Sequence, residues 1–134
     1  MKIFNIILRI VLCLILITPI LGALGIFPPP TADLYNTKEA FAFISILFTT
    51  KYVLYLEALV FLIAIILTAM NRMAVVALLI LPITVNIIAF HAFLDGGLLT
   101  SGAVLADVLF LLNIYFLWHN REKYKILWSG SASV

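Results

Sequence analysis

YVLYLEALVFLIAIILTAMNRMAVVALLILPITVNIIAFHAFLD, residues 52–95, contains two long apolar runs separated by a very tight polar turn at Asn71 and Arg72. The runs cover residues 52–70 and 74–94. At a rise of about 1.5 Å per residue, a helix needs about 20 apolar residues to cross a bilayer, and both runs are close to that length. The stretch therefore predicts two membrane-spanning helices.

Two further apolar runs, residues 3–27 and 101–118, bring the expected number of spans to four. The chain of 134 residues is 66% hydrophobic and only 10% charged, which is typical of membrane proteins. Four spans leave no room for a separate soluble domain, so we expect one all-α domain, an integral membrane four-helix bundle over residues 1–134. An alternative for the first run is a secretory signal peptide cleaved near residues 22–25, but the length of the run favours a retained helix.

The connection between the first two spans predicts a short helix. Three prolines, residues 28–30, end the first span, because proline fixes φ and cannot continue the backbone ladder. Asn36 followed by Glu39 resembles a capping box at the start of a helix over residues 37–49. That helix is apolar but too short to span, so we expect it to lie in the membrane interface. The tail, residues 119–134, ends in small polar residues and is expected to be disordered there.

The lysines and arginines predict the orientation of the chain. Basic residues concentrate on the cytoplasmic side of membrane proteins. Placing both termini in the cytoplasm puts five of them inside and two outside, which favours this N-in, C-in arrangement. The inner set is Lys2, Arg72, Arg121, Lys123 and Lys125, and the outer set is Lys38 and Lys51. The net charge of +2 does not indicate a nucleic-acid partner.

Three ionisable residues on three different spans fall at nearly one depth. Counted at the helical rise, Glu57 lies about 9 Å below the outer surface, His91 about 6 Å and Asp107 about 9 Å. Ionisable groups inside hydrocarbon are costly and are expected to have a partner or a function. We therefore predict one outer polar cluster of these three residues. It is either a structural clasp between helices or a site for a ligand or a proton.

Two asparagines and one arginine are further polar residues within the predicted spans. Asn86 and Asn113 lie near the midplane on the third and fourth spans, where an amide hydrogen bond between them would hold the helices in register. Arg9 stands apart, near the cytoplasmic end of the first span. It either extends to the inner lipid head groups or has a role inside the bundle, such as anchoring an anionic head group. Asp95 is interpreted as a loop residue that caps the following Gly-Gly turn.

Several chemistries are not expected. The last span would separate His91 near the outer face from His119 near the inner end, by about 27 Å of helix, so one molecule cannot bind a haem between two histidines. Cys13 is the only cysteine and is interpreted as a packing residue, so neither a disulfide nor a zinc site is expected. The sequence contains no Gly-rich phosphate loop or nucleophile elbow, and we do not expect catalysis by this chain alone.

The chain resembles the DoxX-like family of small membrane proteins. The resemblance rests on the glutamate-bearing apolar helix YLEALVFLIAIIL from Tyr55, on the span LLILPITVNIIAFHAFLD of residues 78–95, and on the ending HNREKYKILW. The positions that match are Glu57, Asn86 and His91.

This resemblance implies a four-helix protein of the bacterial inner membrane. The activity of such a protein is unassigned and its cofactor unknown; the leading hypothesis is an accessory subunit of a quinone-linked membrane oxidoreductase system, in which the outer polar cluster contacts a quinone head group or a partner subunit. Besides the lipid bilayer, the expected partner is another membrane protein or a second copy of the chain. A small proton-coupled transporter and a purely structural membrane scaffold stay open as alternatives.

Overall fold

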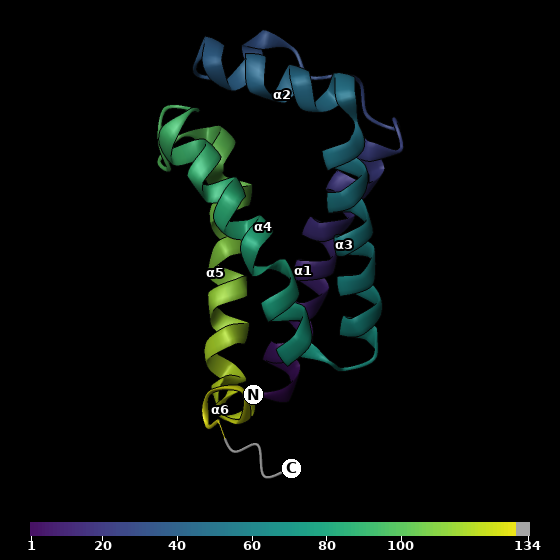
Figure 1. Ribbon diagram of the computed structural model, residues 1–134, viewed down its shortest axis with the longest axis vertical. Helices are drawn as coiled ribbons and strands as arrows, with labels where there is room; N and C mark the ends of the chain where they lie inside the picture. Colours follow the sequence, from purple (N-terminus) through teal and green to yellow (C-terminus); the bar gives the residue numbers. More distant parts are fainter. Residues whose placement is uncertain (131–134) are drawn as a thin grey trace.

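Four long apolar helices form most of the computed structural model, which describes residues 1–130 (Figure 1). They are α1 (Lys2–Ala23), α3 (Tyr52–Ala69), α4 (Met73–Phe93) and α5 (Val104–His119), the last preceded by the 3-10 turn η2 (Ser101–Ala103). Each is long and apolar enough to cross a membrane, with η2 and α5 counted as one. The expected all-helical fold with four candidate spans is confirmed for this part of the chain. The tail end at residues 131–134, expected to be disordered, lies outside it.

The long helices pack in a continuous set around one apolar core. α1 packs along α3, α4 packs along α5, and α3 packs against α4; α1 also contacts α5. Four fully buried side chains, Leu12, Phe61, Ile80 and Phe116, represent all four helices in this core. The outward faces remain apolar and exposed, as expected for surfaces that face lipid.

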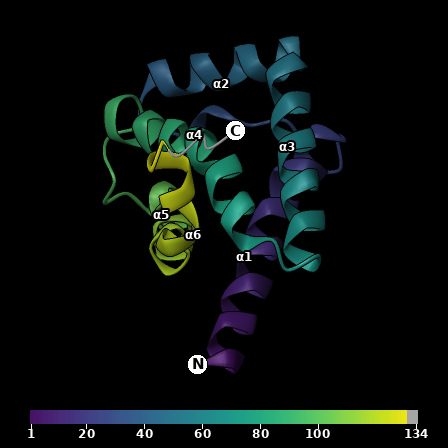
Figure 2. The ribbon, with the colours of Figure 1, turned by 60° about the horizontal axis from the view of Figure 1, so that its bottom comes forward.

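The short elements lie at opposite ends of this set. The helix α2 (Lys38–Thr50) crosses one end, and the helix α6 (Arg121–Trp128) follows α5 at the other end (Figures 1 and 2). A single 3-10 turn, η1 (Ala32–Leu34), precedes α2. The chain therefore places α2 and α6 at different surfaces.

The first helix ends before its apolar run does, because a glycine cap stops it. Gly25 has a φ of +75°, a left-handed conformation that glycine adopts without strain. The Ile26 N–H donates to the Leu21 carbonyl, which closes a Schellman motif before the prolines are reached. The prediction of a helix as far as residue 27 was therefore too long.

The second helix agrees closely with the predicted range, but its cap is a different residue. Thr37, and not Asn36, accepts the hydrogen bond from the Ala40 N–H at the start of α2. The capping box with Asn36 was wrong because the Asn36 side chain contacts Asp95 instead. At the other end, Lys51 has a φ of +61° and joins α2 directly to α3.

The helix α6 was not predicted from the sequence of the tail. The Tyr124 hydroxyl donates to the carbonyl of Ala74 at the start of α4, at 2.9 Å, and this contact ties α6 to the end of the long helices. An ion pair between Glu122 and Lys125, one turn apart, further supports the helix. A helix of eight residues depends on such tertiary contacts, which a sequence pattern does not reveal.

Candidate functional site

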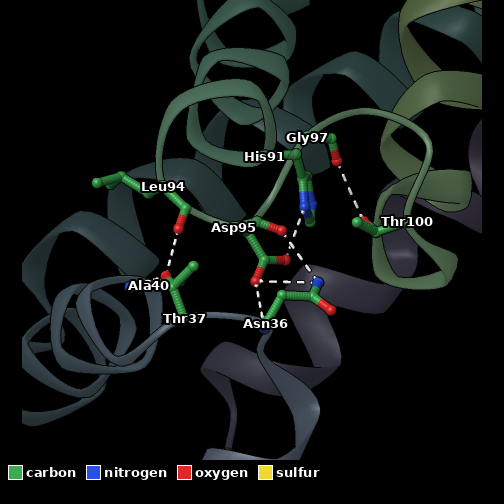
Figure 3. Close-up of polar contacts among 8 residues, drawn as sticks. All are labelled: Asn36, Thr37, Ala40, His91, Leu94, Asp95, Gly97 and Thr100. Carbon is green, nitrogen blue, oxygen red and sulfur yellow. Dashed lines mark hydrogen bonds and ion pairs between the residues drawn. The ribbon is translucent and has the colours of Figure 1, made fainter.

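Asp95 joins the end of α4 to the segment that leads into α2 (Figure 3). Its side chain is only 1% exposed. One carboxylate oxygen accepts a hydrogen bond from the Asn36 backbone N–H at 2.8 Å, and the other lies 3.0 Å from His91 Nδ1. Because a carboxylate only accepts, Nδ1 carries the proton in this pair. We name these three residues, Asn36, His91 and Asp95, the Asp95 clasp.

Two further hydrogen bonds strengthen the same connection. The Asn36 side-chain amide donates to the Asp95 carbonyl at 3.0 Å, and the Thr37 hydroxyl donates to the Leu94 carbonyl (Figure 3). Two consecutive residues before α2 thus bind two consecutive residues after α4. This pairing holds α2 across the end of the long helices.

The turn after Asp95 requires glycine, because its backbone passes very close to Asn36. Gly96 has a φ of +84°, and a Cβ atom added there would lie 3.1 Å from the Asn36 Cβ. The backbone of the turn therefore packs directly against the Asp95 clasp. The Gly97 N–H donates to the His91 carbonyl at 2.8 Å, which returns the chain onto the end of α4.

Gly96→Ala is expected to lower the free energy of unfolding by about 2 kcal/mol, because it adds left-handed strain and pushes Asn36 away from Asp95. Thermal unfolding followed by circular dichroism in one detergent measures the change. Gly25→Ala is the matched control, since Gly25 has a similar φ of +75° but open space around its Cβ position. Equal destabilisation by both variants would show that the contact with Asn36 contributes nothing.

A pocket lies beside the Asp95 clasp, between α2, α3 and α4. Its volume is about 370 Å³, which is within the range of small-molecule sites. Its polar lining consists of Glu57, Asn86, His91 and Asp95. Tyr35 adds a ring with a hydroxyl, and the other lining residues are apolar or small: Leu34, Phe43, Ile44, Leu47, Val53, Leu54, Ile87, Phe90 and Gly102.

Aromatic rings form one side of this pocket. Phe90 lies at their centre, with its ring centroid 6.4 Å from that of Tyr35 and 5.8 Å from that of Phe43. The His91 ring is 5.1 Å from Phe90 on the same helix. Burial raises the pKa of the Tyr35 hydroxyl, and the negative charge of Asp95 raises it further. Tyr35 therefore stays a neutral hydroxyl, able to donate, over the whole physiological pH range.

The structure brings together some of the predicted site residues and separates others. Glu57, Asn86 and His91 line the same pocket, and the side chains of Glu57 and Asn86 have no hydrogen-bond partner within residues 1–130. Asp107 is half-buried in the first turn of α5 and does not line the pocket. Asp95 joins the cluster instead, although we interpreted it as a loop cap. Its position four residues after His91, one helical turn away, is the sequence feature that could have predicted their contact.

Asn113 forms a separate network at the level of the core. It is fully buried, its amide donates to the Ala77 carbonyl at 2.9 Å, and its carbonyl oxygen lies 2.8 Å from the Thr84 hydroxyl. The expected bond between Asn86 and Asn113 does not form, because Thr84 and the α4 backbone supply the partners. Thr84 also lies 2.9 Å from the Leu81 carbonyl, in the turn that contains the helix-interior Pro82.

Arg9 contacts the turn between α3 and α4. Its Nη1 donates to the Asn71 side-chain oxygen at 2.5 Å. Arg9 is half-buried, and its Nε is shielded from solvent without a hydrogen-bond partner in the part of the chain that the structure describes. Arg9 therefore neither pairs with Glu57 nor extends freely away from the helices.

Metal-ligating residues do not gather in the described part of the chain, residues 1–130, where no group of three or more His, Cys, Asp or Glu side chains is placed to hold a metal ion. His91 lies in the last turn of α4, near α2, and His119 is the last residue of α5, next to α6. The His119 ring stacks on Tyr115.

Comparison of the chain with family models, with curated proteins and with solved structures gave no match.

Proposed function

We propose that this chain is a DoxX-like integral membrane protein whose pocket beneath α2 binds the head group of a quinone, in support of a membrane oxidoreductase. The observation that supports this proposal is the composition of the pocket. Unpartnered polar groups of Glu57 and Asn86 and the paired imidazole of His91 converge on one aromatic, apolar cavity. Such a combination is typical of sites for small apolar molecules with a few hydrogen-bonding groups.

In this proposal, the four long helices form a bundle across the bacterial inner membrane, with both termini in the cytoplasm. Five basic side chains near α6, the start of α1 and the α3–α4 turn support this orientation, against two at the ends of α2. The helix α2 then lies in the outer interface as a cover over the pocket. The quinone head group is held in the outer half of the membrane, and its tail lies in the lipid.

The polar groups of the pocket match both oxidation states of such a head group. A quinone has two carbonyl acceptors, and the Asn86 amide and the Tyr35 hydroxyl are donors. A quinol has two hydroxyl donors, and the Glu57 carboxyl accepts. With the Nδ1 proton of His91 donated to Asp95, the Nε2 of His91 is left as a second acceptor. The same pocket therefore suits a ligand that is reduced and oxidised elsewhere.

Glu57→Ala and Asn86→Ala are each expected to raise the Kd for a short-tailed benzoquinone about tenfold, because each removes one hydrogen bond to the head group, worth about 1.4 kcal/mol. Titration calorimetry of the purified protein in detergent measures the Kd. Asp107→Ala is the matched control, because it removes an ionisable side chain that lies outside the pocket. An absence of binding by the unaltered protein would overturn the quinone part of the proposal.

A second candidate, proton-coupled transport, is favoured by one observation. Three ionisable side chains, Glu57, His91 and Asp95, line the same cavity, as the members of a proton relay do. Proton flux into proteoliposomes that is lost in Glu57→Gln would support transport, because glutamine keeps the shape of the side chain but cannot carry the proton. If neither flux nor quinone binding is found, the Asp95 clasp is the remaining role of the cluster, and the chain is a structural scaffold.

A further inference from the structure

Two adjoining cavities lie toward the other end of the molecule, along α1. The first, which we name the polar cavity after the residue types around it, has a volume of about 270 Å³ and is lined by Lys2, Asn5, Ile6, Arg9 and Asn71. Four of these residues follow one face of α1, at the spacing of successive helical turns. This cavity contains two cationic side chains and no acidic one.

An apolar groove continues directly from this polar cavity. Its volume is about 410 Å³, and it shares Ile6 and Arg9 with the polar cavity. The remaining lining residues come from α1 and α3: Ile10, Cys13, Leu14, Ile17, Ile65, Thr68 and Ala69. From Ile6 to Ile17 the groove follows α1 for about 16 Å, which is close to half of a hydrocarbon core of about 30 Å. The groove thus matches the depth of one leaflet.

Arg9 lies where the two cavities meet, and not all of its N–H donors have an acceptor within residues 1–130. Among residues 1–130, the side-chain oxygen of Asn71 is its one acceptor, bound by Nη1 at 2.5 Å. Its Nε has no acceptor in residues 1–130 and is out of contact with solvent. Glu122, on α6 at the same end of the molecule, is paired with Lys125. The Arg9 side chain is half-buried, and an anion in the polar cavity would supply the acceptor that its Nε lacks within residues 1–130.

We propose that these cavities hold an anionic glycerophospholipid, with its phosphate between Lys2 and Arg9 and one acyl chain in the groove along α1 and α3. Phosphate oxygens accept several hydrogen bonds in the fork geometry that a guanidinium offers. The bond from Arg9 to Asn71 holds that guanidinium in place before the lipid arrives. The charge of the polar cavity selects against a zwitterionic lipid, whose positive group would meet two cations.

The proposed site is independent of the quinone pocket. It lies near the α3–α4 turn and the start of α1, whereas the pocket lies beneath α2, at the opposite end of the long helices (Figure 1). Occupation of the lipid site joins α1, α3 and the turn into α4. We therefore expect the bound lipid to stabilise the packing of α1.

The test uses delipidated full-length protein in a neutral detergent, titrated with phosphatidylglycerol and followed by native mass spectrometry and thermal unfolding. Phosphatidylglycerol is expected to bind saturably at one copy and to raise the unfolding temperature, whereas phosphatidylcholine with the same acyl chains does neither. Arg9→Gln is expected to weaken the binding at least about tenfold, and Lys2→Gln about fivefold, the effect of one basic side chain near an anionic lipid. Arg121→Gln, which removes an exposed arginine of α6, is the matched control and leaves the binding unchanged.

Each alternative occupant of the two cavities predicts a different experimental result. Equal stabilisation by phosphatidylcholine would overturn the proposal, as would unchanged binding in both Arg9→Gln and Lys2→Gln. Equal stabilisation by inorganic phosphate alone would show a free-anion site without use of the groove. Lys2→Gln keeps the test decisive if Arg9→Gln fails to fold, because the Lys2 side chain is exposed.

Discussion

Asp95→Ala is expected to lower the free energy of unfolding by about 2–4 kcal/mol, the cost of leaving two hydrogen-bond donors at this buried side chain without their acceptor. The carboxylate is almost completely buried and accepts from both Asn36 and His91. Alanine leaves the Asn36 N–H and the His91 ring without that acceptor, and both are costly to leave unpaired. Thermal and denaturant unfolding in one detergent, followed by circular dichroism, measure the loss.

Asp33→Ala is the control for Asp95→Ala. Asp33 is a carboxylate in the same connection before α2, but it is exposed, so its removal is expected to have no measurable effect on unfolding. Asp95→Asn is expected to recover part of the loss, because the amide oxygen still accepts from Asn36. An unchanged unfolding temperature in Asp95→Ala would show that α2 is held in place by its apolar contacts alone.

Asn113→Ala is expected to lower the free energy of unfolding by about 2 kcal/mol. Two hydrogen bonds between α4 and α5 contribute about 0.6–1 kcal/mol each in a membrane setting, and the void left behind adds to the loss. The Ala77 carbonyl also loses the side-chain donor that ties α4 to α5 at this level. The same unfolding measurement checks the value.

A double-mutant cycle separates the hydrogen bond of Asn113 from its packing. Thr84→Val removes only the hydroxyl that contacts Asn113 and keeps the shape of the side chain. The coupling energy between Thr84→Val and Asn113→Ala is expected to be about 0.6–1 kcal/mol. Strictly additive effects would mean that the hydroxyl interacts with the Leu81 carbonyl and not with Asn113, since its single proton is shared between the two.

Part of the candidate site could be predicted from depth along the helices. Glu57 and His91 were placed at a similar level, and they do line one pocket together with Asn86. Depth does not predict which way a side chain faces around the helix axis. Asp107 has a suitable depth but does not line that pocket. The rotation of each helix about its axis depends on how its side chains pack against neighbouring helices. The pattern of residues along one sequence does not reveal that packing.

The contacts at the ends of helices were the least predictable. Asn36 was assigned to a local cap and Asp95 to a local turn, because both residue types commonly bind their own neighbours in sequence. In the structure they bind each other across 59 positions of the chain. Likewise, Arg9 contacts Asn71, 62 positions away. Local preference and distant partners compete for the same polar groups, and only the folded chain decides between them.

The sequence by itself determined the all-helical class, the four apolar helices and the short helix after the prolines, because each depends on apolar length and on local backbone restrictions. Only the tertiary structure decided the joining of α2 to α4 by the Asp95 clasp, the pairing of Asn113 with Thr84 and the position of Arg9 between two cavities. These depend on the rotation of the helices and on the meeting of their ends. In an apolar chain many helix faces are similar in composition, so many packings of the helices would be similar in energy. The few buried polar groups favour the one packing in which they meet their hydrogen-bond partners.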